Sequence, residues 1–304
     1  MNKEVCKVCQ PSEPVTCPYI AHMEKAHFTE PKPIACKWCG STDIKKYGTR
    51  KDVQEYLCLK CGRKFIAKDA PSHKQTSSEL IGTSISSYFD GLSFADIARR
   101  LAESNNPVNE STVYRWVISY SEKAVRMMES YKPKVSDVWI ADETALKFES
   151  DIHWLWDIID RDTRFLLASY LSDHRGTKQA ERLMELASKR AGKVPQIVIT
   201  DKLAAYLDGI ELAFGADTEH IQSSPFASKD DTNVIERFHG TIKDRTKVIR
   251  GFKSFDTAIT ILDGFLVHYN FFKPHLWLEG KTPAEVAGIK LPFKTWTEFV
   301  EQDK

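Results

Sequence analysis

The sequence lacks any long apolar run. No stretch approaches the roughly 18 consecutive apolar residues that a membrane-spanning helix needs. The opening residues, MNKEVCKVCQ, contain no apolar segment of the kind found in signal peptides. We therefore expect a cytoplasmic protein without a membrane partner, in a compartment where thiols stay reduced. The seven cysteines then indicate metal ligands before disulfides.

Net charge is also nearly absent. The 304 residues carry 43 Lys and Arg against 42 Asp and Glu, and their 42% apolar and 28% charged content is typical of a globular protein with a large core. The balance hides two basic regions: residues 32–74 hold 11 Lys and Arg against 4 acids, and residues 236–253 hold 6 against 2. Such regions in a nearly neutral chain favour an anionic partner, most commonly nucleic acid.

Low-complexity tracts are missing, and so are internal repeats apart from Cys-x-x-Cys pairs. Polar stretches at 68–78 and 130–137 indicate linkers, and the residues between them show apolar positions at helical spacing. We predict the following segments: a zinc-finger-like segment at 1–30, a zinc ribbon at 31–68, a helix-turn-helix domain at 75–130, a core at 137–290 and a C-terminal tail at 291–304.

The core begins with short strands. They are VWIAD at 138–142, HWLWDIID at 153–160 and RFLLASYL at 164–171. A helix over 176–192 follows, and QIVIT at 196–200 is a continuous apolar run, which indicates a strand buried on both faces. This order predicts an α/β fold in which helices flank a mixed sheet.

Four cysteines form two Cys-x-x-Cys pairs that are 18 residues apart: Cys36, Cys39, Cys58 and Cys61. The spacing is typical of structural zinc, because two intervening residues let both thiolates of a pair reach one tetrahedral ion. Gly40 and Gly62 follow the pairs, where a tight turn needs positive φ. The segment between the pairs predicts a β-hairpin that turns near Gly48. The alternative is a small core of four unligated cysteines.

A second set of candidate zinc ligands precedes these: Cys6, Cys9, His22 and His27. Their spacing fits the finger pattern of two cysteines and two histidines. However, the stretch between them lacks the usual large apolar residues, and Cys17 is a fifth candidate ligand. The alternative is a disordered, proline-rich tail. We therefore expect one Zn²⁺ ion per chain, or two if this second site forms.

The helical segment resembles a helix-turn-helix. Its first helix is expected to begin at Ser93, and its second to be capped by Asn109 or Ser111. Apolar residues of the second helix recur at i, i+3, i+4 and i+7 and should face inward: Val113, Trp116, Val117 and Tyr120. Ser111, Thr112 and Arg115 then lie outward near the end that reaches base edges in DNA. The alternative is a helical hairpin used for packing or dimerisation.

Three acids are candidates for a metal site in the core. Asp142 ends the strand VWIAD, Asp201 follows the strand QIVIT, and Glu236 lies on the predicted helix NVIERFHGTIKDRTK. If the two strands are parallel neighbours, both aspartates reach one edge of the sheet, where a crossing helix can add the glutamate. Clustered carboxylates need cations, and hard oxygen ligands select Mg²⁺ or Mn²⁺, two of which support phosphoryl transfer. Taken singly, each acid is more simply a turn residue, a helix cap or a solvated charge.

The helix that carries Glu236 has two faces. At about 100° per residue, four residues share one face, and they are Asn233, Glu236, Gly240 and Lys243. The glycine would let a nucleic-acid backbone come close, and Lys243 could hold a phosphate. His239 lies near the proposed site, and Arg245 and Lys247 are further candidates for DNA contact. The apolar face consists of Val234, Phe238 and Ile242.

These residues carry a resemblance to a known family. Asp142, Asp201 and Glu236, with 34 residues between the last two and Lys243 seven after the glutamate, look like the DDE triad of the transposase and retroviral-integrase superfamily. HYNFFKPHLWLEGKTPAEVAGI at 268–289 resembles the tail of integrase-type cores. Together with the helix-turn-helix, WIADET, TDK and GFKSF, it is most similar to insertion-sequence transposases of the sixth family from bacteria and archaea.

The resemblance covers about residues 75–290. It implies an RNase H-like fold, two catalytic Mg²⁺ (or Mn²⁺) ions held by the three acids, and binding to double-stranded DNA at the terminal inverted repeats of the element and at its target. The cysteine-rich N-terminus departs from the shortest members, so no family role is carried onto it.

The expected function is that of a transposase at the bacterial or archaeal nucleoid. Water cuts a phosphodiester at the end of the element, and the freed 3′-hydroxyl attacks target DNA by direct transesterification. Joining two ends predicts a homodimer or a higher oligomer on DNA. Two alternatives are a zinc-containing helix-turn-helix regulator that keeps its core only for dimerisation, and a metal-dependent nuclease that cuts without joining.

Overall fold

The computed structural model of the chain describes residues 34–50, 53–66, 76–148, 151–223, 233–249 and 255–303. The chain divides into two compact units, Met1–Ala67 and Lys68–Lys304. The predicted ligands of a second zinc ion lie outside the described residues: Cys6, Cys9, His22 and His27. No helix in the described ranges is both long and apolar enough to cross a bilayer.

The first unit contains a three-stranded antiparallel sheet in the order β1-β2-β3. Its strands are β1 (Ile44–Arg50), β2 (Val53–Cys58) and β3 (Lys64–Ile66). The prediction of a hairpin was right, but its turn was misplaced, because the chain reverses between Arg50 and Val53. Gly48 lies inside β1, where the pairing shifts register after Lys46. A glycine within a strand often marks such a bulge rather than a turn.

Three helices open the second unit: α2 (Ser78–Phe89), α3 (Phe94–Glu103) and α4 (Glu110–Met128). Each follows a residue whose side chain accepts a backbone N–H of the first turn, which satisfies a donor that the helix leaves unpaired. These caps are Ser77, Ser93 and Asn109, so Asn109 rather than Ser111 caps α4. The predicted inward face of α4 is buried: Val113, Trp116, Val117 and Tyr120.

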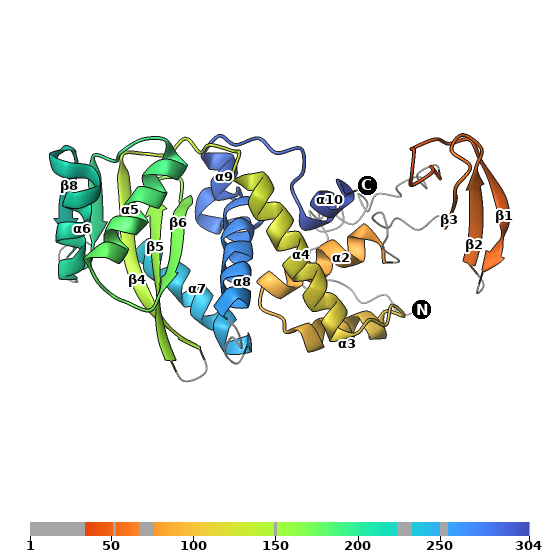
Figure 1. Cartoon of the computed structure of the whole chain (residues 1–304), viewed down its shortest axis with the longest axis horizontal. Coiled ribbons are helices and arrows are strands. Elements are labelled where there is room, and N and C mark those ends of the chain that lie inside the picture. The colour runs from red at the N-terminus through yellow and green to blue at the C-terminus, as the bar shows by residue number, and fades with distance from the viewer. Residues whose placement is uncertain are drawn as a thin grey trace, which may run out of the picture. The chain divides into compact units, whose positions relative to one another are not determined.

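A five-stranded sheet follows, in the order β6-β5-β4-β7-β8 (Figure 1). Its strands are β4 (Val138–Phe148), β5 (Asp151–Asp160), β6 (Leu166–Ser172), β7 (Ile197–Thr200) and β8 (Glu219–Gln222). β4, β5 and β6 pair antiparallel, whereas β7 pairs parallel with both β4 and β8. The predicted mixed sheet flanked by helices is thereby confirmed.

β4 is longer than the sequence predicted. It does not end at Asp142 but continues to Phe148, because it forms a long hairpin with β5 in which Phe148 pairs with Asp151. On its other side, β4 pairs with β7 only from Val138 to Ile140. Asp142 therefore lies within β4, just beyond the point where its parallel neighbour stops.

Helices cover both faces of this sheet (Figure 1). They are α5 (Thr177–Ala191), α6 (Ala204–Phe214), α7 (Asn233–Ile249) and α8 (Phe255–Val267). On one face, the ring of Trp156 on β5 meets that of Tyr206 on α6 at 5.6 Å between centroids. The next residue, Asp157, contacts His239 of α7. Because successive residues of a strand point to opposite faces, α6 and α7 lie on opposite sides of the sheet.

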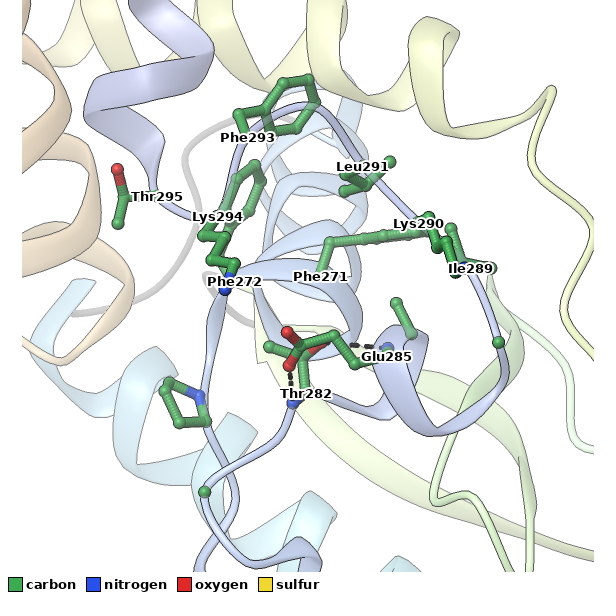
Figure 2. Close-up of a pocket in the computed structure, with 14 residues that line it drawn as sticks. Phe271, Phe272, Thr282, Glu285, Ile289, Lys290, Leu291, Phe293, Lys294 and Thr295 are labelled. Carbon is green, nitrogen blue, oxygen red and sulfur yellow. Dashed lines mark hydrogen bonds between the residues drawn. The ribbon is translucent and has the colours of Figure 1, made fainter.

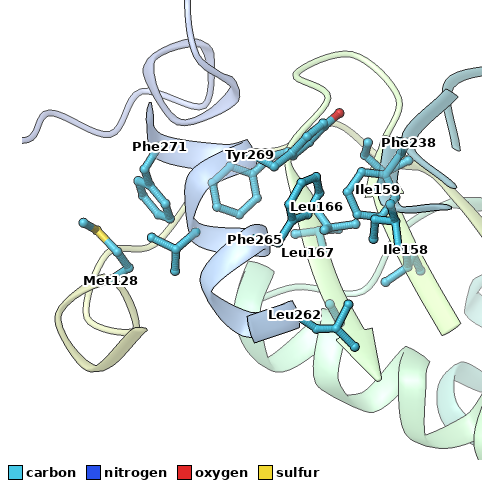
Figure 3. Close-up of a cluster of buried hydrophobic side chains, with 14 of the residues drawn as sticks. Met128, Ile158, Ile159, Leu166, Leu167, Phe238, Leu262, Phe265, Tyr269 and Phe271 are labelled. Atoms are coloured by element: carbon cyan, nitrogen blue, oxygen red, sulfur yellow. The ribbon is translucent and has the colours of Figure 1, made fainter. Parts of the chain in front are cut away.

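A 3₁₀ turn η1 (Gly215–Asp217) lies between α6 and β8. After α8 come short elements: a π-helical turn η2 (His268–Phe272), a 3₁₀ turn η3 (Leu276–Leu278), and the helices α9 (Pro283–Val286) and α10 (Trp296–Glu301). One hydrophobic core runs through the second unit, and Figure 3 shows the part between α8, η2 and the sheet. α8 packs closely on α4, since a Cβ at Gly264 would lie 2.4 Å from Ser121 Oγ. The helices α2–α4 and the sheet are therefore parts of one compact unit.

A pocket of about 560 Å³ opens beside η2 and α9 (Figure 2). Phe271 and Phe272 line it together with Thr282 and Glu285, which form the capping box of α9. None of the predicted site residues is among the described residues that line this pocket. The predicted chemistry belongs instead to the edge of β4.

Candidate active site

Asp142 and Asp201 come from neighbouring parallel strands. In the pairing of β4 with β7, Ile140 lies opposite Ile199, so continuing the register by two residues brings Asp201 opposite Asp142. β7 ends at Thr200, and Asp201 is the first residue beyond it. The two strands are thus parallel neighbours, which is the condition under which both aspartates reach one edge of the sheet.

A third acid, Glu143, lies close to Asp142 and Asp201. Asp142, Glu143 and Asp201 each offer a carboxylate oxygen, and the three oxygens lie within 4.8 Å of one another. Within the described part of the chain, Glu236 does not belong to this group, and its side chain is exposed on α7. Glu236 as a ligand therefore stays a prediction. The sequence analysis missed Glu143, although the adjacent acids in WIADET were a visible signal.

The end of β7 explains how two consecutive residues of one strand can share a site. Asp142 faces α7, and Glu143 faces the opposite side, where the segment before α5 lies. In the described sheet, no strand pairs with this edge of β4 beyond Ile140. The carboxylates of Asp142 and Glu143 start from opposite faces of β4. They can approach each other past the unpaired edge of this strand, next to Asp201.

A turn after β7 fixes Asp201. Its Oδ1 accepts the backbone N–H of Leu203 at 2.9 Å, and the Thr200 hydroxyl donates to its backbone carbonyl at 2.7 Å. α6 begins after Leu203, so Asp201 is not the residue that caps this helix. The turn holds the carboxylate at the strand end without using a basic partner.

Glu143 is buried and bound by an arginine. Its side chain is only 1% exposed, and its Oε1 accepts hydrogen bonds from Nε of Arg175, at 2.8 Å, and from Nη2. The guanidinium also lies 4.5 Å from the ring centroid of Trp154. Burial raises the pKa of Glu143 and the charge of Asp201 acts in the same direction, while the hydrogen bonds from Arg175 and the nearby hydroxyl of Tyr206 oppose both. A cation nearby would favour the charged form.

His239 of α7 connects Asp142 to a buried acid. Its Nδ1 lies 3.3 Å from Asp142 Oδ2, and its Nε2 lies 3.0 Å from Oδ2 of Asp157, which is fully buried. The hydroxyl of Ser169 donates to the other oxygen of Asp157 at 2.6 Å. Burial alone would lower the pKa of His239, but the hydrogen bonds and charges of the two aspartates outweigh it and raise the pKa to about 9. A protonated His239 donates to both carboxylates and fixes the direction of Asp142.

The two faces of α7 are arranged as the sequence predicted. The residues of the polar face are all exposed: Asn233, Glu236, Gly240 and Lys243. Phe238 and Ile242 are buried, and Val234 is half-buried. The polar face is therefore open to a large ligand such as DNA.

Arg245 is buried, so the prediction that it contacts DNA was wrong. It was predicted to contact DNA, but it is only 5% exposed, and its guanidinium lies 3.8 Å from the ring centroid of Tyr88 on α2. Its position on the helix turns it toward α2 rather than toward solvent. The side chain of Lys247 lies outside the described residues.

The cysteine cluster of the first unit has the shape of a metal site. The sulfur of Cys36 lies 3.6 Å from that of Cys61, the sulfur of Cys39 lies 3.6 Å from that of Cys58, and all four lie within 4.8 Å of one another. A tetrahedral ion with metal–sulfur distances of about 2.3 Å separates its ligands by similar amounts. Burial would raise the pKa of Cys58, but hydrogen bonds from the Cys61 backbone and the other thiols lower it to about 7. Thiolate, the form that binds metal, is thus accessible near neutral pH at Cys58. At Cys39 a backbone hydrogen bond from Ser41 lowers the pKa, but burial and the other three thiols outweigh it and raise the pKa to about 12.

Both glycines that follow the cysteine pairs adopt the predicted conformation. Gly40 and Gly62 each have φ of 70°, in the left-handed region that favours glycine. Cys36 and Cys58 are buried with Phe65, which gives the unit its small core. The local backbone therefore fits the two-pair pattern that the spacing predicted.

The outward side chains at the start of α4 form a small polar surface. Ser111 and Arg115 are exposed and Thr112 is half-buried. Arg115 donates from Nε to the Ser111 carbonyl at 3.0 Å and from Nη2 to the Thr112 hydroxyl at 3.3 Å. These positions match the predicted outward set, and their contact with DNA stays a prediction.

Comparisons with known proteins place this site in context. Residues 136–275 match the family model described as the DDE domain. The chain is 28% identical over 226 residues to the transposase for insertion sequence-like element IS431mec of Staphylococcus aureus, covering 72% of this chain and 97% of the relative. It is equally similar to the transposase for insertion sequence element IS257 in transposon Tn4003 of the same species.

Solved structures with a similar arrangement include retroviral integrase cores. The HTLV-2 integrase catalytic core domain in complex with magnesium aligns with a TM-score of 0.40 at 18% identity, over 51% of this chain and 97% of that one. The catalytic core domain of BIV integrase aligns with a TM-score of 0.37 at 15% identity, over 50% of this chain and 93% of that one.

Proposed function

We infer that this chain, whose residues 136–275 match the model of the DDE domain, is the transposase of an insertion sequence and cuts and joins DNA at the ends of its element. Relatives named as insertion-sequence transposases match nearly their whole length. The observation that carries the proposal is the meeting of Asp142 and Asp201 at one edge of the sheet, with carboxylate oxygens within 4.8 Å.

The chemistry of this edge fits divalent metal ions. The donors of the group are all carboxylate oxygens, which suit Mg²⁺ or Mn²⁺, and Oε2 of Glu143, one of its members, is buried outside the hydrogen-bond geometry of any group in the described part of the chain. We propose that Asp142, Asp201 and Glu236 hold two such ions. When bound, the ions supply charge neutralisation at the phosphate and a more acidic water.

The side chains of the chain orient the reaction. Water attacks a phosphodiester at the element end and the 3′-oxygen leaves with a proton; the resulting 3′-hydroxyl then attacks a phosphodiester of the target, and one bond is exchanged for another. His239 keeps Asp142 in one direction through Nδ1, because Nε2 is bound to the buried Asp157. Lys243, exposed two turns after Glu236, is suited to bind a backbone phosphate.

Other parts of the chain serve to bind DNA. We propose that α4 presents Ser111, Thr112 and Arg115 to the terminal inverted repeat, and that Lys247 adds a backbone contact. The first unit would hold one Zn²⁺ ion through Cys36, Cys39, Cys58 and Cys61 and add positive charge. Because two element ends must be held together, at least two chains would act on the same DNA.

Strand transfer by purified full-length protein tests the function. The substrate is a duplex that carries the terminal repeat of the element, incubated with Mg²⁺, Mn²⁺ or EDTA. We expect Asp142→Asn and Asp201→Asn to lower joining by at least about 100-fold, while band shifts show unchanged DNA binding. Asp208→Asn, an exposed acid of α6, is the matched control and should join as the wild type does.

Two results would contradict the proposal. Joining at the wild-type rate by Asp142→Asn would remove this residue from the site. Binding of the repeat by the wild type without cutting or joining, under each metal, would favour a regulator that has kept only the DNA-binding parts.

A further inference from the structure

We propose that Glu143 is a further ligand of the divalent-metal site and that Arg175 positions it. This inference rests on the proposed metal site at Asp142 and Asp201. Its basis is that the Glu143 carboxylate brings an oxygen to within 4.8 Å of oxygens of both aspartates, although it starts from the other face of the sheet. Glu143 would thus give the site a ligand from each side of β4.

The two oxygens of Glu143 have different surroundings. Oε1 accepts hydrogen bonds from Nε and from Nη2 of Arg175. Oε2 is buried, and in the part of the chain that the structure describes no donor is within hydrogen-bond geometry of it; the buried hydroxyl of Tyr206 is near enough to Glu143 to lower its pKa but also makes no hydrogen bond of good geometry. A buried anionic oxygen without a donor is unfavourable, and native proteins seldom leave one. A cation at the carboxylate cluster supplies the missing partner.

Arg175 holds the carboxylate in this position. Its guanidinium is fixed on one side by the ring of Trp154, at 4.5 Å from the centroid, and donates twice to the same oxygen on the other. Because Arg175 binds Oε1, Oε2 is left available to a metal ion. Glutamate ligands of metal sites are often oriented in this way by a second hydrogen bond.

The competing explanation is a purely structural ion pair that ties the segment before α5 to β4. Such a pair explains Oε1, but it leaves Oε2 with only the Tyr206 hydroxyl nearby, outside hydrogen-bond geometry. It also gives no reason for a third acid to stand beside two aspartates, because like charges this close repel each other. The two explanations differ in what happens to metal affinity when Glu143 is changed.

Titration of the full-length protein with Mn²⁺, followed by calorimetry and by the loss of the free-ion EPR signal, separates them. We expect Glu143→Gln to weaken Mn²⁺ binding at least about tenfold and to reduce the rise in Tm that Mn²⁺ produces in the wild type. Glu185→Gln is the matched control, because Glu185 also pairs with an arginine, Arg182, but is exposed on α5. It should bind Mn²⁺ as the wild type does.

Two further variants keep the test decisive. Glu143→Asp retains the charge but withdraws the carboxylate by one methylene group, so it should also weaken Mn²⁺ binding if Glu143→Gln does not fold. Arg175→Lys should weaken binding less than either, since it affects only the orientation of Glu143. Wild-type affinity in Glu143→Gln, or in Glu143→Asp, would overturn the inference.

Failure of this inference is distinguishable from failure of the proposed function. If the wild type joins DNA and binds Mn²⁺ while the Glu143 variants bind Mn²⁺ equally well, only the role of Glu143 is wrong. If the wild type neither binds Mn²⁺ nor joins DNA, the proposed metal site itself is wrong.

Discussion

Replacing His239 by leucine tests the link between the buried acid and the active site. Leucine fills a similar volume but offers no N–H group. Asp157, which is 0% exposed, then loses the partner that lies 3.0 Å from its Oδ2 and, among the side chains that the structure describes, keeps only the hydroxyl of Ser169 on Oδ1. Removing one partner of a buried pair costs about 3–5 kcal/mol. Because the Ser169 hydrogen bond remains, we expect a loss of roughly 2–4 kcal/mol.

Urea unfolding at pH 7, followed by tryptophan fluorescence in EDTA, measures this loss. His153→Leu is the control, since His153 is 16% exposed and lies 2.6 Å from Asp173, which is 67% exposed; a pair with one partner in solvent should contribute at most about 1 kcal/mol. An unchanged urea midpoint in His239→Leu would refute the view that the buried pair stabilises the fold.

A double variant separates stability from catalysis. His239→Leu with Asp157→Asn removes the buried charge together with its partner, so we expect it to recover most of the lost stability. Asp142 still lacks the donor that lies 3.3 Å from its Oδ2, and removing an outer partner of a metal ligand typically costs 10–100-fold in affinity or activity, about 1.4–2.7 kcal/mol. Strand transfer should therefore stay low in a folded protein. Full activity of the double variant would show that His239 has no role in positioning Asp142.

The remaining predictions concern the zinc site and one buried acid. Cys58→Ser should lower the zinc content measured by mass spectrometry by one ion per chain, and equal zinc in both proteins would remove the proposed site. Burial raises the pKa of Asp263 to about 6 from an ordinary value of 3.8, with a smaller effect from Glu129. The folded state then holds a proton that the unfolded state has released between about pH 4 and pH 6, so stability should fall as pH rises through this window and stay lower above it. Asp263→Asn should abolish this dependence and raise stability at pH 7 by up to about 3 kcal/mol, and parallel pH profiles of the two proteins in urea unfolding would contradict it.

Local features of the fold were readable from the sequence because their causes are local. The side chains of Ser93 and Asn109 accept N–H groups within their own helix turns, and Gly192 ends α5 with φ of 72° because a glycine tolerates this conformation. The continuous apolar run of β7 likewise predicted that this strand is buried. From these elements the mixed sheet flanked by helices could be predicted, whereas the parallel pairing of β4 and β7 was a condition that the sequence left open.

Features that depend on distant partners were not readable. The length of β4 depends on its hairpin with β5, so the strand was predicted to end at Asp142. Arg245 looked like a DNA contact by its charge alone, but its environment is set by Tyr88 from α2. Glu143 was missed because strand alternation sends it away from Asp142, and only the early end of β7 lets the two carboxylates meet around the strand edge.

The charges around Asp142, Glu143 and Asp201 indicate where a cation would bind. On the α7 face, Asp142 has His239, and on the opposite face Glu143 has Arg175. Among the described residues, no basic side chain forms an ion pair with Asp201, whose Oδ1 is held by a backbone N–H. Each face therefore compensates its own acid, and the uncompensated charge sits in the gap beyond Thr200 that both faces share. A divalent ion at this point would meet the negative charge of Asp201, which no basic side chain of the described residues compensates. Carboxylate oxygens of Asp142, Glu143 and Asp201 lie within 4.8 Å of one another there.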